Sequence, residues 1–343
     1  MQKINKIAAL FLAIPLIFSS CKKEENKTVV TENYKGTLIV NEGGFQKSNG
    51  SIGLYKPGTD TYVDAYQAAN GIPLGDVVQS ISAINNSFYI VVNGSNKIEV
   101  VNQSNFKNTA TIMASSPRYV HKINNKKAYI SHLFKNEVSI LNLETNEIDK
   151  TIDIKHWSEH FGQIDSIIYI GTNSTKVMMI NANTDRVIDS IEIGKGLGKI
   201  QQLSATKIAI LSAGAKDWTS GAVLTNGKVV FISNTPAKIV STVNLTTGNF
   251  GGAMCYNSGT DKVYVALGGS AIYEVSGTTA IDWTTLDGTS IYGLGLDIAT
   301  GNIYATDAKD YSSNGTVSII NSSKKNVKTL TVGIVPNAVF FNN

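Results

Sequence analysis

Histidine is the side chain best suited to proton or metal chemistry near neutral pH, and this chain has four: His121, His132, His156 and His160. His156 and His160 stand four residues apart, so a local helix would bring their imidazoles together, as metal ions favour. A short spacing of this kind is a weak predictor of function by itself. We therefore predict no metal site from these histidines.

Motifs for other known chemistries are missing from the sequence. It has no Gly-x-Ser-x-Gly elbow, no phosphate-binding glycine loop and no EF-hand loop. Cys255 is the only cysteine besides Cys21, and we interpret it as a buried, inert thiol. The formal net charge is +4 with no block of like charge, which argues against a nucleic-acid partner. These absences favour a binding protein without a cofactor over an enzyme.

The elements that would position a binding site are short strands. Between residues 124 and 164, runs rich in Val, Ile, Tyr and Thr occur at positions 127–131, 138–141 and 151–154. Turn residues such as Asn and Thr separate these runs, which is typical of strands. No window there keeps apolar residues at the 3.6-residue period of a helix.

This three-strand pattern recurs along the chain. Its tyrosine returns at Tyr89, Tyr129 and Tyr169, spaced by 40 residues, and again at Tyr264 and Tyr304, also 40 apart. A repeat of about 40 residues with four strands per unit is typical of a β-propeller. One such unit cannot bury its own faces, so the units must stack side by side.

We count seven units and therefore predict an all-β, seven-bladed β-propeller with four antiparallel strands per blade. The first unit starts at residues 36–41 without an inner strand, and residues 335–341 resemble the inner strand that opens the other units. We predict that the N- and C-terminal strands pair in one blade and close the ring, which would remove exposed sheet edges. The fifth unit has an insertion at 212–228, and residues 35–343 form one domain.

The N-terminal segment precedes this domain. Residues 1–20 combine lysines with a short apolar stretch, as in a signal peptide, and end directly before Cys21. The sequence Phe-Ser-Ser-Cys at 18–21 resembles a bacterial lipobox, so we expect Cys21 to be lipidated. Residues 21–34 would form a polar tether. The sequence Lys-Lys-Glu-Glu at 22–25 is similar to a signal for export to the outer face of the outer membrane.

The repeat itself resembles a known class. A tyrosine-containing strand followed by Val-Ser-Ile-Leu-Asn, Thr-Asn and Thr-Ile-x-Ile is similar to YVTN-repeat propellers, and the likeness covers residues 35–343. Asn-Glu-Gly at 41–43, Leu-Gly-Asp at 74–76 and Pro-Arg-Tyr at 117–119 resemble motifs of a subgroup of surface lipoproteins. Members of that subgroup capture cobalamin and dock on a TonB-dependent transporter. The resemblance implies a corrinoid as ligand and such a transporter as partner.

In a propeller, the connections from an outer strand to the next inner strand lie on the same face as the loops between second and third strands. The aromatic and polar residues of the predicted site fall in these two sets of loops. Aromatic loops on a rigid scaffold suit a small-molecule pocket with a few polar groups. We predict a ligand-binding site there made of Glu42, Phe45, Gln79, Arg118, Tyr119, His132, Phe134, Trp157, Trp218, Phe250, Tyr292 and Tyr311.

Two other functions remain open. Glu42, Asp76 and Asp307 could converge on the central channel and hold Ca²⁺ in a metal-dependent hydrolase of the lactonase type. The same loop face could instead bind proteins or glycans as a surface scaffold. Fold alone decides neither.

Overall fold

The computed structural model describes residues 34–196, 199–233, 238–249 and 251–342. The chain divides into two units, Met1–Glu32 and Asn33–Asn343, and everything described below belongs to the second. The predicted signal peptide, Cys21 and all but the last residue of the predicted tether lie outside the described residues, as does Phe250.

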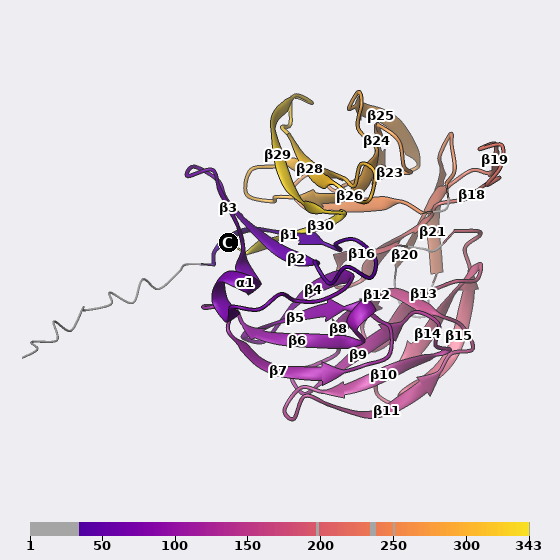
Figure 1. Cartoon of the computed structure of the whole chain (residues 1–343). Helices are drawn as coiled ribbons and strands as arrows, with labels where there is room; N and C mark the ends of the chain where they lie inside the picture. The colour runs from indigo at the N-terminus through magenta and orange to yellow at the C-terminus, as the bar shows by residue number, and fades with distance from the viewer. Residues whose placement is uncertain (1–33, 197–198, 234–237, 250, 343) are drawn as a thin grey trace, which may run out of the picture. The chain divides into compact units, whose positions relative to one another are not determined.

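Seven four-stranded antiparallel sheets form a ring (Figure 1). The strands of each blade are named below from the inner strand to the outer strand. Blade 1 has β30 (Pro336–Asn342), β1 (Gly36–Asn41), β2 (Ser51–Lys56) and β3 (Thr61–Asp64). Blade 2 has β4 (Val78–Ile84), β5 (Ser87–Val92), β6 (Lys97–Asn102) and β7 (Asn108–Met113). Blade 3 has β8 (Pro117–Lys122), β9 (Lys127–His132), β10 (Glu137–Asn142) and β11 (Glu147–Asp153).

The remaining four blades continue the same order. Blade 4 has β12 (Ser158–Ile164), β13 (Ile167–Thr172), β14 (Lys176–Asn181) and β15 (Arg186–Glu192). Blade 5 has β16 (Lys199–Ser204), β17 (Lys207–Ser212), β20 (Lys228–Ser233) and β21 (Lys238–Asn244). Blade 6 has β22 (Ala253–Asn257), β23 (Lys262–Ala266), β24 (Ala271–Ser276) and β25 (Thr279–Thr285). Blade 7 has β26 (Ile291–Leu296), β27 (Ile303–Asp307), β28 (Asn314–Ile320) and β29 (Asn326–Ile334). The predicted seven-bladed β-propeller is confirmed.

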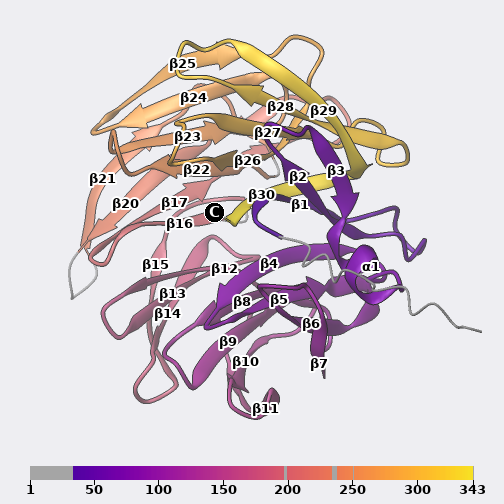
Figure 2. The same cartoon turned by 90° about the vertical axis from the view of Figure 1, so that its left-hand side faces the viewer.

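The two ends of the ring close in blade 1, as predicted. Strand β30 pairs antiparallel with β1, so that Phe340 lies opposite Leu38 and Val339 opposite Ile39. Figure 2 shows the C-terminal β30 beside the N-terminal β1. Blade 7 approaches this seam closely: a Cβ on Gly293 of β26 would lie only 2.1 Å from the carbonyl oxygen of Asn337. A side chain at this position would therefore push the closing strand out of place.

Two of the recurring tyrosines connect neighbouring blades. The hydroxyl of Tyr89 in blade 2 donates to Asn146 Oδ1 at 2.9 Å, in the turn between β10 and β11 of blade 3. The hydroxyl of Tyr129 in blade 3 contacts Asp185 in the corresponding turn of blade 4. In these two blades the contact requires a tyrosine at the same place in the repeat, whereas the hydroxyl of Tyr264 donates to Glu274 within blade 6 at 3.3 Å.

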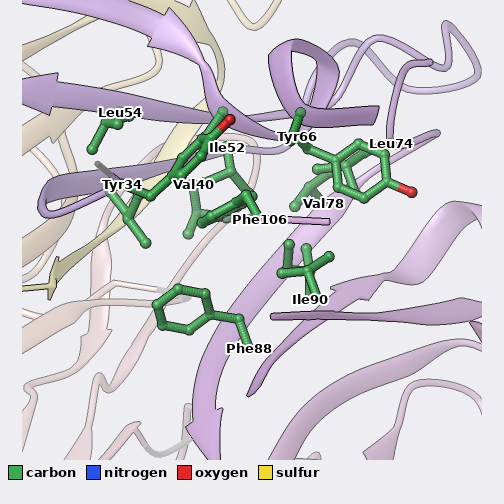
Figure 3. Packing of buried hydrophobic residues seen from close by; sticks show 14 of the residues in the cluster. Tyr34, Val40, Ile52, Leu54, Tyr66, Leu74, Val78, Phe88, Ile90 and Phe106 are labelled. Carbon is green, nitrogen blue, oxygen red and sulfur yellow. The ribbon is translucent and has the colours of Figure 1, made fainter. Parts of the chain in front are cut away.

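The hydrophobic core is divided among the contacts between blades. Side chains of blades 1 and 2 form one cluster that includes Leu38, Val40 and Ile90 (Figure 3). In this cluster Phe106 is fully buried and stacks on Tyr34, with ring centroids 5.1 Å apart. Because each blade buries its faces only against its neighbours, stability depends on an uninterrupted ring.

Two local features depart from the expected repeat. The outer strand of blade 1 ends at Asp64 and helix α1 (Ala65–Asn70) follows it directly. The Asp64 carboxylate accepts the backbone N–H groups of Tyr66 and Gln67 at 3.1 Å and caps the helix. The insertion in blade 5 forms a hairpin of β18 (Ala215–Lys216) and β19 (Val223–Thr225), which stands out from the ring in Figure 1.

Helical structure in the described residues is limited to α1 and the 3₁₀ turn η1 (Asn93–Ser95). Neither is long or apolar enough to cross a membrane.

Candidate ligand-binding site

β-bulges at the start of the inner strands build the candidate site. Five of the seven inner strands shift register at or directly after their first residue. An extra residue at such a point breaks the alternation of a strand and re-aims a side chain. The bulged positions hold Gln79, Arg118, Glu159, Tyr292 and Asn337, and all of these residues line the same cavity.

The cavity has a volume of about 1220 Å³ and receives residues from all seven blades. Blades 5 and 6, whose inner strands have no bulge at their start, contribute Lys199, Gly251 and Gly252. The loops between second and third strands supply the outer part of the wall, including Phe134 and Trp218. The two loop sets that propeller topology predicts on one face therefore meet in one cavity.

An ion pair between blades 3 and 4 forms one side of the cavity. The Arg118 Nε–H is shared between the two carboxylate oxygens of Glu159, at 3.1 and 2.9 Å. The same guanidinium donates from Nη1 to the Gln79 side chain, whose Nε2 donates to the Tyr119 hydroxyl at 3.2 Å. Burial opposes the charge of Arg118, but Glu159, Tyr119 and Glu42 together outweigh it and raise the pKa of Arg118. Arg118 is a fixed cation in this wall.

A second polar group spans the closing seam. Asn337 Nδ2 donates to Glu42 Oε1 at 2.9 Å and to the Gln79 carbonyl oxygen at 3.0 Å. The Tyr292 hydroxyl donates to the same Glu42 oxygen at 3.4 Å. Burial raises the pKa of Glu42, and the hydrogen bond from Asn337 partly offsets this effect. The Asn337 Oδ1 atom is buried without a hydrogen-bond partner among the described residues.

Aromatic side chains surround the mouth of the cavity. Phe45, Phe134 and Trp218 are 74%, 65% and 82% exposed, which is unusual for large apolar side chains. Tyr292 and Tyr311 pack edge to face with centroids 5.7 Å apart. The site thus combines a fixed polar lining with an apolar rim, as small-molecule pockets do.

Nine of the twelve predicted residues line this cavity: Glu42, Phe45, Gln79, Arg118, Tyr119, Phe134, Trp218, Tyr292 and Tyr311. Trp157 lies outside the lining but packs edge to face on Phe134, with centroids 4.8 Å apart. His132 is buried below the loop, where its ring nitrogens bond the Ser115 carbonyl at 2.7 Å and the Ser139 hydroxyl at 2.8 Å. Phe250 lies outside the described residues.

The residues considered for metal chemistry have local partners. Asp76 accepts the backbone N–H of Gln46 at 3.1 Å, and Asp307 accepts that of Lys309 at 2.8 Å. Strand β12 starts at Ser158, so the helical turn that would pair His156 with His160 does not form. In the described part of the chain, no three His, Cys, Asp or Glu side chains gather as metal ligands would.

The lining also contains polar residues that were not predicted from the sequence, among them Glu159, Lys199 and Asn337. The sequence contains a signal for Glu159 and Lys199. Together with Arg118 they recur at intervals of 41 and 40 residues, which is the length of the blade repeat. Comparing equivalent positions of successive inner strands would have found them. Cys255 lies on inner strand β22 and is buried, and burial raises the pKa of its thiol to about 12.

The fold and the cavity define a seven-bladed β-propeller with a ligand-sized cavity at one mouth of its channel. The chain belongs to the family described as "Domain of unknown function (DUF5074)", whose model matches residues 35–332. No curated protein matches the chain.

Several solved structures share the fold at low sequence identity. A quinonprotein alcohol dehydrogenase-like protein from Bacteroides thetaiotaomicron is 16% identical with a TM-score of 0.66, covering 90% of this chain and 79% of that one. The hydrazine synthase of Kuenenia stuttgartiensis is 12% identical with a TM-score of 0.60, covering 88% of this chain and 99% of that one. The Pan2 WD40 domain of Neurospora crassa is 12% identical with a TM-score of 0.56, covering 80% and 86%. Identities this low support the fold alone.

Proposed function

We propose that this protein is a lipid-anchored cell-surface lipoprotein that binds cobalamin or a related corrinoid in the cavity and delivers it to a TonB-dependent outer-membrane transporter. The observation that carries the proposal is the convergence of nine predicted residues, from blades 1, 2, 3, 5 and 7, on one cavity. Residues of the subgroup motifs at 41–43 and 117–119 are part of its lining.

The size and chemistry of the cavity support a large, rigid ligand. Its volume of about 1220 Å³ exceeds the range of roughly 300–1000 Å³ that is usual for small-molecule pockets. A corrinoid offers a wide macrocycle for the aromatic rim and amide side chains for the polar groups of Arg118, Gln79 and Asn337. A rigid macrocycle also loses little conformational entropy on binding, which favours high affinity.

Calorimetric titration of the purified protein with cyanocobalamin tests the proposal. We expect saturable binding that Trp218→Ala and Tyr311→Ala each weaken by about 1–3 kcal/mol, roughly 5- to 150-fold. Both side chains are mostly exposed, so their removal should leave the fold intact. Ile298→Ala is the matched control, because this exposed side chain lies outside the cavity, in the turn between β26 and β27. No heat and no co-elution at micromolar protein would refute corrinoid binding.

The membrane anchor and the transporter belong to the same proposal. Cys21 would carry the lipid and residues 22–34 would allow the propeller to reach the transporter. Corrinoid uptake by intact cells should then require both the cavity and Cys21, whereas binding by the purified protein should require only the cavity. Uptake that survives loss of Cys21 would contradict delivery from the membrane surface.

A further inference from the structure

Lys199 is a cation of the cavity wall without a carboxylate to balance it. It opens inner strand β16 of blade 5 and lines the cavity. None of the ion pairs among the described residues includes it. Burial lowers the pKa of its ammonium group, and the neighbouring Cys255 opposes this only in part. Lys199 is only partly buried and lines the cavity, so a ligand in the cavity can reach it.

Two further side chains with ring or guanidinium nitrogens, His160 and Arg118, lie in the same wall. The charges of Lys199 and Arg118 both act on His160 and, together with burial as the main cause, hold its pKa well below its usual range. His160 packs edge to face on Tyr119, with centroids 3.9 Å apart, in the wall between the other two. Glu159 and Gln79 fix Nε and Nη1 of Arg118, while Nη2 makes no hydrogen bond to any described residue. Nitrogen-bearing side chains of blades 3, 4 and 5 therefore line the same wall of the cavity.

The carboxylates of the cavity are already occupied. Glu159 is bonded to Arg118, as described above. Glu42 belongs to the closing seam, where Asn337 and Tyr292 donate to it at 2.9 and 3.4 Å. Against these two carboxylates the lining holds Arg118, Lys199 and Lys216. The wall of blades 3 to 5 thus has an excess of positive charge that no described carboxylate meets.

We propose that Arg118, His160 and Lys199 form an anion subsite that binds an oxyanion of the ligand, such as a phosphate or a carboxylate. Hydrogen bonds between charged groups are roughly twice as strong as neutral ones, so one oxyanion would pair with the Lys199 ammonium and orient the ligand. The inference builds on the proposed function because it requires a ligand in this cavity. If that ligand is cobalamin, the group is the phosphodiester of its nucleotide loop, which cobinamide lacks.

Thermal unfolding with inorganic phosphate tests the subsite without any corrinoid. We expect phosphate, at ionic strength matched with chloride, to raise the melting temperature of the purified protein in a saturable way. Lys199→Met should abolish this rise and, without phosphate, should melt at or above wild type because it removes a charge that has no ion-pair partner among the described residues. Lys126→Met, at a surface lysine 74% exposed, should respond to phosphate as wild type does.

Other outcomes would overturn the subsite. A phosphate effect that survives Lys199→Met places the anion elsewhere, and the absence of any effect at tens of millimolar phosphate removes the subsite. If Lys199→Met lowers the melting temperature equally with and without phosphate, Lys199 has only a structural role.

Corrinoid titrations separate this inference from the proposed function. We expect Lys199→Met to weaken cyanocobalamin binding at least about tenfold and to leave dicyanocobinamide binding within about twofold. Phosphate stabilisation without corrinoid binding would refute the proposed function and support the subsite. Tight binding of cyanocobalamin that Lys199→Met leaves unchanged would support the proposed function and refute the subsite.

Discussion

Arg118→Met should destabilise the propeller because it strands a buried carboxylate. The Glu159 side chain is only 7% exposed, and the Arg118 side chain is 19% exposed at the cavity wall. Removing one partner of a fully buried ion pair costs about 3–5 kcal/mol. Because water in the cavity screens the pair in part, we expect a smaller loss of about 2–3 kcal/mol in the free energy of unfolding.

Urea unfolding, followed by tryptophan fluorescence, measures this loss, and a double-mutant cycle isolates the pair. Arg118→Met combined with Glu159→Gln removes the stranded charge and should recover about half of the loss. The pair Lys126–Glu144 is the control, since its side chains are 74% and 58% exposed. Lys126→Met should cost no more than about 0.5 kcal/mol. An Arg118→Met variant as stable as this control, or strictly additive effects in the cycle, would refute our account of the buried pair.

Three further predictions concern the ring, its pH dependence and its anchor. Deleting residues 335–343 removes inner strand β30 and should abolish cooperative unfolding; a melting temperature within a few degrees of wild type would contradict ring closure. Burial lowers the pKa of His121 and His160 below 6.5, so the unfolded chain binds protons more readily and stability should fall as the pH drops below about 6.5. His160→Asn should flatten that fall in urea titrations, and an unchanged slope would contradict it. Cys21→Ala should move the protein from the membrane fraction to the soluble fraction, and continued sedimentation with membranes would rule out the lipid anchor.

The sequence predicted the ring because a tyrosine-containing second strand recurs in five of the seven blades. Tyr89 and Tyr129 must each reach the outer turn of the next blade, so a 40-residue period is visible without an alignment. Closure was predictable for a related reason, since a first unit without an inner strand needs one from elsewhere. Helix α1 was missed because it is only six residues long and depends on its cap at Asp64 and on burial of Tyr66.

The rim of the site was predictable and its polar lining only partly so. Propeller topology assigns Phe134, Trp218 and Tyr311 to one face, because loop position follows from strand order. Topology does not reveal β-bulges, which turn Glu159 and Asn337 into the cavity and depend on backbone register. His132 is the opposite case, because it was predicted to belong to the site but lies outside the cavity lining.

In the sequence, a histidine next to a loop at the end of a strand is a candidate for contact with a bound molecule. In the structure, His132 satisfies both of its ring nitrogens beneath the loop with Ser115 and Ser139. Hydrogen bonds of this kind depend on tertiary packing, which residue spacing does not encode.

The position of cobalt in crystals grown with saturating cyanocobalamin tests the central claim most directly. Diffraction at the cobalt absorption edge locates the metal independently of any interpretation of the surrounding density. We predict one anomalous peak inside the cavity, enclosed by the lining of Arg118, Tyr292 and Asn337 and the rim at Trp218. A peak outside the cavity, or none at saturating corrinoid, would contradict corrinoid binding at this site.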